Sequence, residues 1–288
     1  MDWFGLSLAA AFTQATSDAI VKSRFSHLGP YEMGTVRLLY ALPWLGLALF
    51  FIPVPQLDAQ FFLTVAMALP VEILALVCYM SAIRSSPLSL TLPFLSFTPV
   101  FLVATGRLIL GERLSSREIA GVALIVTGSY LLNISSVRRG LLAPLRAMLG
   151  QRGPRLMLLT AFLYSITSAL GKRAILHSSS AFFGVFYFAC LAVVMSCMLP
   201  LFTHGKAVRL VGRPLSGLAL GLVYAAMVFT HTAAISMTQA ASMIALKRTS
   251  MLFAILYGAL FFRETDIGQR LLGAGVMMAG VLVLGFAA

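Results

Sequence analysis

The sequence predicts an all-α polytopic membrane protein in which ten transmembrane helices form two inverted five-helix repeats. Three observations lead to this prediction: the composition, the recurrence of long apolar runs, and an internal repeat. Of the 288 residues, 60% are hydrophobic and only 10% are charged, whereas soluble domains contain about 25% charged residues. Apolar runs of roughly 20 residues, the length of a membrane-crossing helix, recur instead of the alternating segments of a membrane barrel.

Turn-forming residues divide the chain into ten expected spans. Proline and glycine lie between the apolar runs, for example in 27–30, 53–55, 85–87, 153–154 and 213–214, and these residues favour turns over continued helix. The first run lacks a positively charged leader segment, so we expect a retained helix and no cleaved signal peptide. The expected spans are residues 4–21, 34–52, 61–83, 88–110, 119–132, 156–176, 181–201, 215–237, 240–262 and 267–286.

The two halves of the chain resemble each other. At an offset of 150 residues (161 − 11), Ala11-Phe12 aligns with Ala161-Phe162. An offset of 152 residues (264 − 112) aligns Glu112 with Glu264 and also pairs two glycines of each half, Gly121 with Gly273 and Gly128 with Gly280. Because five spans are an odd number, the second half enters the membrane in the opposite orientation, and a central site is expected between the halves.

The domain organisation follows from this repeat. We expect a first repeat at 1–134, a basic loop at 135–153 and a second repeat at 154–288; leucines in the loop could form a short interfacial helix. Fourteen of the 21 Arg and Lys residues lie in or beside loops that follow odd-numbered spans, five follow even-numbered spans, and the other two are Lys247 and Arg248. The positive-inside rule then places the loop in the cytoplasm and both termini outside.

Composition and motifs exclude several other classes of protein. The net charge of +12 does not indicate nucleic-acid binding, because the cations lie between apolar runs and form no separate basic domain. The three cysteines lie in expected spans without metal-ligand spacing. No phosphate-binding glycine loop or nucleophile–base pair is evident. We therefore expect that the protein is not an enzyme and that it binds no cofactor and no metal.

Glu72 is the acid expected nearest the membrane centre, in the middle of the third span. A buried carboxylate without a partner takes up a proton more readily than one in water, which suits proton coupling. Two alternatives stay open: Glu72 could bind the amine of a substrate, or form a structural ion pair with Lys247 or Arg248.

Lys247 and Arg248 lie inside the expected ninth span, where a cation costs at least ~2.5 kcal/mol on insertion scales unless it faces protein or a watery cavity. Neighbouring helical residues point about 100° apart, so one of the two should face the cavity while the other packs between helices or snorkels. We favour Arg248 as the contact for a substrate anion, because its planar fork suits carboxylates, and Lys247 as the partner of Glu72. A purely structural pairing is the alternative.

Further polar residues in the expected spans are candidates for lining the cavity. His231 aligns with Tyr79 at the 152-residue offset, so the two repeats place ring side chains at equivalent positions. Each such residue could instead make an ordinary hydrogen bond between helices. The remaining substrate-binding candidates are Gln14, Tyr40, Ser96 and Tyr164.

Each half closes with a glycine-rich span that follows a glutamate: Glu112 precedes Gly121, and Glu264 precedes Gly273. With the ten spans and the run Lys247–Ser250, this arrangement resembles the EamA-type branch of the drug/metabolite transporter superfamily. The resemblance implies a multi-pass inner-membrane secondary transporter, often an exporter of amino acids, related metabolites or drugs, working by alternating access. It also implies cytoplasmic termini, opposite to the charge count. We expect both terminal glutamates to be structural, capping loops or pairing with Arg113, Arg117 or Arg263.

Residues and resemblance together predict a proton-coupled exporter of a small amino-acid-like or amino-acid-derived carboxylate. The alternative is a multidrug exporter of cationic amphipathic compounds, with Glu72 meeting the cation. The expected partners are the small-molecule substrate and the lipid bilayer, without nucleic acid, and the protein would act as a monomer or homodimer.

Overall fold

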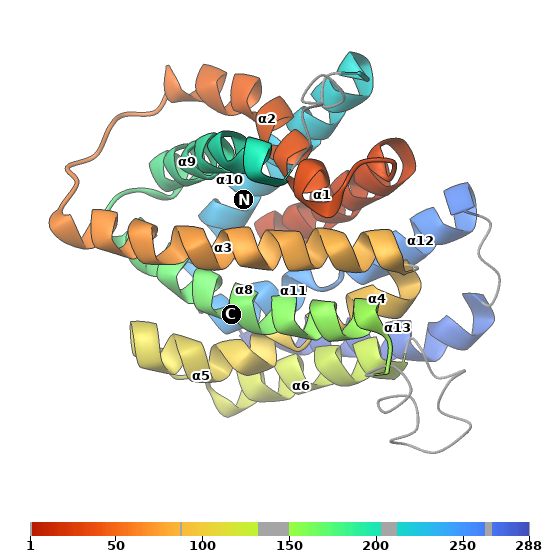
Figure 1. Ribbon diagram of the computed structural model, residues 1–288. Coiled ribbons are helices and arrows are strands. Elements are labelled where there is room, and N and C mark those ends of the chain that lie inside the picture. The colour runs from red at the N-terminus through yellow and green to blue at the C-terminus, as the bar shows by residue number, and fades with distance from the viewer. Residues whose placement is uncertain (1, 87, 132–149, 203–211, 263–266, 288) are drawn as a thin grey trace.

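The computed structural model describes residues 2–86, 88–131, 150–202, 212–262 and 267–287, and every regular element in these ranges is a helix (Figure 1). The first half contains α1 (Trp3–Phe25), α2 (Pro30–Leu49), α3 (Ala59–Ser85), α4 (Leu88–Leu95), α5 (Thr98–Leu110) and α6 (Ser116–Leu131). The second contains α8 (Arg152–Leu176), α9 (Ser180–Phe202), α10 (Pro214–Met237), α11 (Ala240–Lys247), α12 (Ser250–Phe262) and α13 (Ile267–Ala287).

The fourth and ninth expected spans are each broken into two helices. Pro93 and Pro99 favour an interruption of the fourth span, whereas the break in the ninth corrects the prediction of one continuous helix. The breaks fall at Ser96-Phe97 and Arg248-Thr249, which the 152-residue offset makes equivalent (248 − 96). At both breaks a backbone N–H bonds three residues back instead of four: Phe97 N to Phe94 O at 3.2 Å and Thr249 N to Leu246 O at 3.0 Å. Pairs of broken helices at matching positions are the usual place for transporter binding sites.

Several helices begin earlier than the sequence pattern predicts. Pro30 starts α2 and Pro214 starts α10, and Pro154 lies in the first turn of α8. We had assigned these prolines to turns between helices. Proline is favoured at the first helical positions because its missing N–H would have no helical partner there. Residues that we expected at the beginning of the second span therefore lie one turn further inside α2.

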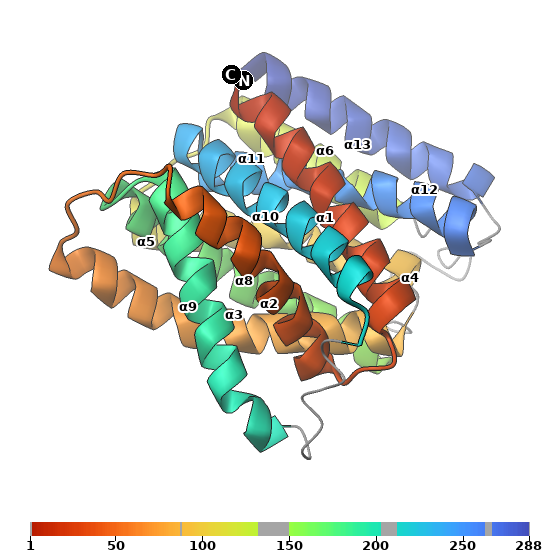
Figure 2. The same ribbon diagram turned by 90° about the horizontal axis from the view of Figure 1, so that it is seen from above.

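The packing of the helices repeats across the two halves. The equivalent of α3 is α10 and that of α1 is α8, and the structure packs α3 along α8 and α10 along α1. The equivalent helices α2 and α9 also contact each other, as do α6 and α13 (Figure 2). Each of these contacts between the two halves is therefore either its own counterpart or has a counterpart in which the halves exchange roles. α1 begins and α13 ends at the same end of the bundle (Figure 2).

Equivalent glycines meet where α6 crosses α13. A Cβ on Gly128 would lie 2.7 Å from the carbonyl oxygen of Gly273, and one on Gly280 would lie 2.8 Å from that of Gly121. The offset of 152 residues makes these two contacts equivalent, because it pairs Gly128 with Gly280 and Gly121 with Gly273. The repeated glycines thus allow close backbone approach at the axis that relates the halves.

Gly221 allows α10 to approach the backbone of α2, and we expect Gly221→Ala to separate these helices. The added Cβ would lie 1.8 Å from the carbonyl oxygen of Tyr40. Because backbone atoms cannot rotate away, the free energy of unfolding of the variant should fall by about 1–3 kcal/mol. The measurement is thermal unfolding in detergent. Gly46→Ala in α2 is the matched control, since nothing lies within 4 Å of its Cβ position. Equal stability of the two variants would contradict this contact.

Three of the described helices are long and apolar enough to cross a bilayer: Ala59–Ser85, Ser180–Phe202 and Pro214–Met237. Large apolar side chains are also exposed elsewhere, including Phe50, Phe51 and Leu108. Exposed apolar surface of this kind marks contact with lipid or another protein. Most of the predicted basic loop, including its suggested interfacial helix, and Glu264 lie outside the described residues.

Asp58 precedes α3 and gives a pH-dependent contact outside the helices. Its carboxylate accepts a hydrogen bond from Phe61 N at 2.8 Å and lies 2.7 Å from His177 Nδ1. The Phe61 N–H and then His177 hold the pKa of Asp58 below its ordinary value. A lowered folded-state pKa stabilises the protein above the unfolded pKa, and this contribution is lost as the pH falls through the folded value.

We therefore expect the melting temperature of the wild type to fall more steeply than that of Asp58→Asn as the pH drops below about 4. Asparagine still caps the helix but does not titrate. The measurement is a series of thermal scans of both proteins across this pH range. Parallel curves would show that Asp58 contributes nothing to the acid sensitivity.

Candidate functional site

A cavity of about 90 Å³ lies between the two repeats. Its lining includes five pairs of residues that the repeat makes equivalent. At an offset of 150 (164 − 14 and 187 − 37) the pairs are Gln14 with Tyr164 and Arg37 with Tyr187; at 152 (224 − 72, 231 − 79 and 247 − 95) they are Glu72 with Tyr224, Tyr79 with His231, and Leu95 with Lys247. The cavity therefore lies on the axis relating the halves, and the polar groups differ between them.

Most of the predicted site residues line this cavity. The structure brings together Gln14, Glu72, Tyr79, Tyr164, His231, Lys247 and Arg248. Tyr40 and Ser96 are not among its lining residues, so they are not placed where we predicted. Tyr40 packs between α2 and α10, against Gly217 and Gly221. The hydroxyl of Ser96 bonds that of Ser129, behind the helix break, and lies 3.6 Å from the sulfur of Met251.

Lys247 and Arg248 both line the cavity, which corrects the prediction that only one of them would. The prediction assumed a continuous helix, but α11 ends at Lys247 and Arg248 lies in the break before α12. Both residues are buried, with relative exposures of 8% and 5%.

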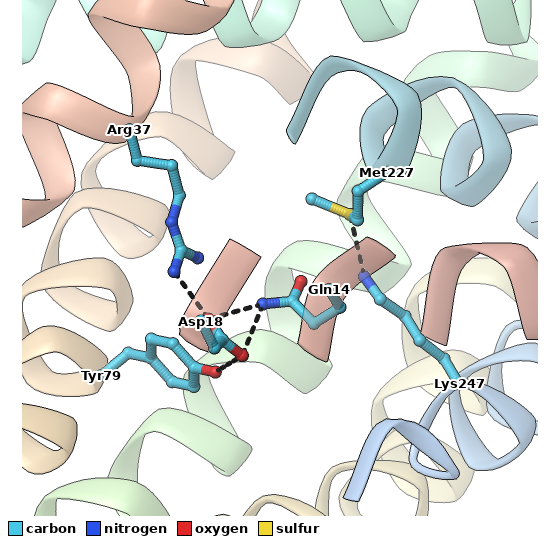
Figure 3. Close-up of polar contacts among 6 residues, drawn as sticks. All are labelled: Gln14, Asp18, Arg37, Tyr79, Met227 and Lys247. Atoms are coloured by element: carbon cyan, nitrogen blue, oxygen red, sulfur yellow. Dashed lines mark hydrogen bonds and ion pairs between the residues drawn. The ribbon is translucent and has the colours of Figure 1, made fainter. Parts of the chain in front are cut away.

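Contrary to the prediction, Lys247 is not bonded to Glu72. Its amino group lies 3.3 Å from the sulfur of Met227 (Figure 3) and 3.3 Å from Nδ1 of His231. Glu72 lies beside Thr167 and within electrostatic reach of Lys247; among the described residues, no ion pair within 4.0 Å joins the two. The acid and the base therefore face one cavity without neutralising each other by direct contact.

The prediction missed a buried ion pair between α1 and α2. Arg37 Nη2 lies 2.6 Å from Oδ1 of Asp18, and the side chains are 2% and 3% exposed. Tyr79 donates its hydroxyl to Oδ2 of Asp18 at 2.5 Å, and the Gln14 amide donates to both oxygens at 3.1 Å (Figure 3). Asp18 lies near the end of the expected span 4–21 and Arg37 near the start of the expected span 34–52, so neither was a candidate for the site. The proline that starts α2 was the signal that Arg37 lies two turns inside a helix.

Arg37 reaches the cavity between two aromatic rings. Its guanidinium carbon lies 5.9 Å from the ring centre of Tyr79 and 5.2 Å from that of Tyr224, distances suited to cation–π attraction. Its only hydrogen bond in the described part of the chain is the one to Asp18, and its Nε is buried without a partner. Arg37 is therefore held firmly while part of its donor edge is unused.

Glu112 is bonded to residues other than the arginines we predicted. It pairs with Lys172 of α8 and accepts the N–H of Ala240, the first residue of α11, at 3.0 Å. Lys172 also donates to the carbonyl oxygen of Thr238 at 2.7 Å. This cluster ties the end of α5 to α8 and to the start of α11, beside the cavity that Lys172 lines.

With each acid and base given its ordinary charge at pH 7 and the imidazole counted as neutral, the residues that line the cavity carry a formal net positive charge. Lys172 is balanced by Glu112, and Arg37 is balanced by Asp18. Of the remaining lining residues, Lys247 and Arg248 are cationic and Glu72 is anionic, which leaves a charge of +1. Since unbalanced charge away from water is costly, this lining favours an anionic group in the cavity.

An all-helical protein with two equivalent halves and a polar cavity on their common axis has the architecture of a secondary transporter. The sequence matches the EamA-like transporter family over residues 2–134 and 151–286, so the chain belongs to that family. This is a multi-pass membrane family of the drug/metabolite transporter superfamily, whose members are transporters and not enzymes.

A solved crystal structure, described only as that of a protein, shares this fold. It matches with a TM-score of 0.73 over 98% of this chain and 96% of that chain, at 15% sequence identity. No curated protein matches the sequence.

The side of the membrane on which the termini lie stays a prediction. The fourteen cations counted at loops after odd-numbered spans included Arg37, which is buried in α2, so the count becomes thirteen against five. This count still places the termini outside, opposite to the orientation that the resemblance implies.

Proposed function

We propose that this membrane transporter is a proton-coupled exporter of a small amino-acid-like carboxylate. The observation that carries the proposal is the charge arrangement on the repeat axis, where Lys247 and Arg248 from one half face Glu72 from the other. Arg248 would bind the carboxylate, since a guanidinium binds it in two places. Glu72 would bind either the amine of the substrate or a proton, and this competition couples the two.

The broken helices support alternating access. Arg248 lies in the break between α11 and α12, and the equivalent break between α4 and α5 follows Leu95, which also lines the cavity. Half-helices can tilt separately on either side of such a break. The substrate would then stay at the axis while the repeats move around it. The aromatic side chains of Tyr164, Tyr187 and Phe183 would hold its apolar part.

The lining charge also bears on the alternative of a multidrug exporter of cationic compounds. A cation entering a cavity with a formal net charge of +1 would meet Lys247 and Arg248, and Glu72 is the only acid among the described lining residues. Like charges in a site of low dielectric constant repel strongly. We therefore favour the carboxylate exporter, in the cell inner membrane, as a monomer or homodimer.

The test is proton movement in proteoliposomes containing the purified protein and a pH-sensitive dye. Adding amino acids or their derivatives to one side should move protons in the opposite direction, and protein-free liposomes should not respond. Comparing the culture media of overexpressing and deletion cells would first identify which metabolites to add. Accumulation of such a metabolite without any proton movement would overturn the coupling.

A further inference from the structure

We propose that Arg37 is a second anion contact in the cavity, and that the substrate carries two carboxylates and one amine, as an acidic amino acid does. This inference rests on the proposed function, because it assumes that Arg248 binds the first carboxylate. It adds a residue to the site and narrows the class of substrate.

The first line of evidence is the unused donor edge of Arg37. Arg37 lines the cavity, and its hydrogen bond to Asp18 uses only Nη2 (Figure 3). Nε of Arg37 is buried and has no hydrogen-bond partner among the described residues. Arginine offers five N–H donors, and buried donors without partners are costly and rare in folded proteins. A ligand acceptor at the free edge of the guanidinium removes that cost.

The second line of evidence is the position of Arg37 relative to Arg248. Both arginines line the same cavity, although one comes from α2 and the other from the break after α11. Nε of Arg248 is likewise buried without a partner in the described residues. Two arginines on one cavity suit two anionic groups carried by one short molecule.

The third line of evidence is charge balance. The lining residues leave a charge of +1 once the Asp18–Arg37 and Glu112–Lys172 pairs are counted as neutral. Two carboxylates and one ammonium group carry a net charge of −1, which balances the cavity. Each group also has a partner of opposite charge: Arg248 and Arg37 for the carboxylates, and Glu72 for the ammonium. A phosphate monoester of an amino acid would exceed this balance.

Ligand pairs that differ in one group test the inference. We would titrate the detergent-solubilised full-length protein with L-glutamate and L-glutamine, and with L-aspartate and L-asparagine, by calorimetry. Within each pair only the side-chain carboxylate becomes an amide. A hydrogen bond to a charged group contributes about 1.5–3 kcal/mol, so the dicarboxylate should bind roughly tenfold or more tightly than its amide.

Two variants then connect this preference to Arg37. Asp18→Asn/Arg37→Gln removes the guanidinium without leaving a lone buried charge, and should bind glutamate and glutamine equally. Arg37→Lys keeps the charge beside Asp18 but loses the fork, and should show a reduced preference. Ser96→Ala, outside the cavity lining, should keep the full preference. A merely structural role of Arg37 would weaken both ligands alike, and that result would overturn the inference.

The outcomes also separate this inference from the proposed function. Arg248→Gln should weaken glutamate and glutamine together, because both carry the first carboxylate. If the wild type binds both members of a pair equally and each depends on Arg248, the second contact is wrong while the carboxylate transporter stands. If no dicarboxylate binds to the wild type, the inference is wrong. If glutamate and glutamine bind independently of Arg248, the proposed carboxylate site fails too.

Discussion

Replacing Glu72 with glutamine should abolish the response of transport to a pH gradient. Each pH unit is worth 1.36 kcal/mol per proton, so exchange of one proton per substrate drives up to a tenfold accumulation. We expect about tenfold accumulation per pH unit in wild-type proteoliposomes and none above equilibrium in Glu72→Gln, which cannot release a proton. The measurement is substrate accumulation at several imposed gradients, with the membrane potential clamped.

Equilibrium exchange distinguishes lost coupling from a damaged protein. Glu72→Gln should still exchange labelled for unlabelled substrate in the absence of a gradient, because its amide can accept a hydrogen bond from an amine. Glu32→Gln is the control, since Glu32 accepts a hydrogen bond from Gly29 N at the start of α2, which a glutamine side chain can also accept. If Glu72→Gln keeps the full gradient response, the proton site lies elsewhere.

Replacing Arg248 with glutamine should remove most of the affinity for carboxylate substrates. Loss of one partner from a buried, hydrogen-bonded charge pair costs about 2–5 kcal/mol, which corresponds to roughly 30-fold weaker binding or more. The methyl ester at the carboxylate proposed to bind Arg248 lacks that anionic group, so its binding should change little. The measurement is competition by the acid and by the ester against a labelled substrate.

Ser96→Ala is the matched control for this experiment. Ser96 occupies in the first repeat the position that Arg248 occupies in the second, at an offset of 152 residues (248 − 96), but it lies outside the cavity lining. Its substitution should leave both acid and ester competition unchanged. Equal losses for the acid and the ester in Arg248→Gln would show that Arg248 supports the fold without contacting the carboxylate.

The sequence by itself determined the helical fold class, the duplication and most of the cavity. Apolar runs of helix length and a preserved offset are properties of the chain that need no tertiary contact to be recognised. The same offset carried Tyr79 to His231, and both line the cavity. Charged or polar residues inside apolar runs, such as Glu72 and Lys247, are conspicuous for the same reason, because their cost in an apolar environment is large.

Only the tertiary structure decided where helices break and which charges meet. Nothing in the run around Arg248 predicted a break, because it contains no proline or glycine at that point; the turn there is held by backbone bonds to residues three positions back. Both Lys247 and Arg248 line the cavity beside that break. The pairing of Asp18 with Arg37 also depends on packing, since it joins two helices whose mutual orientation is set by long-range contacts. Hydrophobic periodicity specifies which face of a helix is buried, but it does not specify which partner a buried charge will meet.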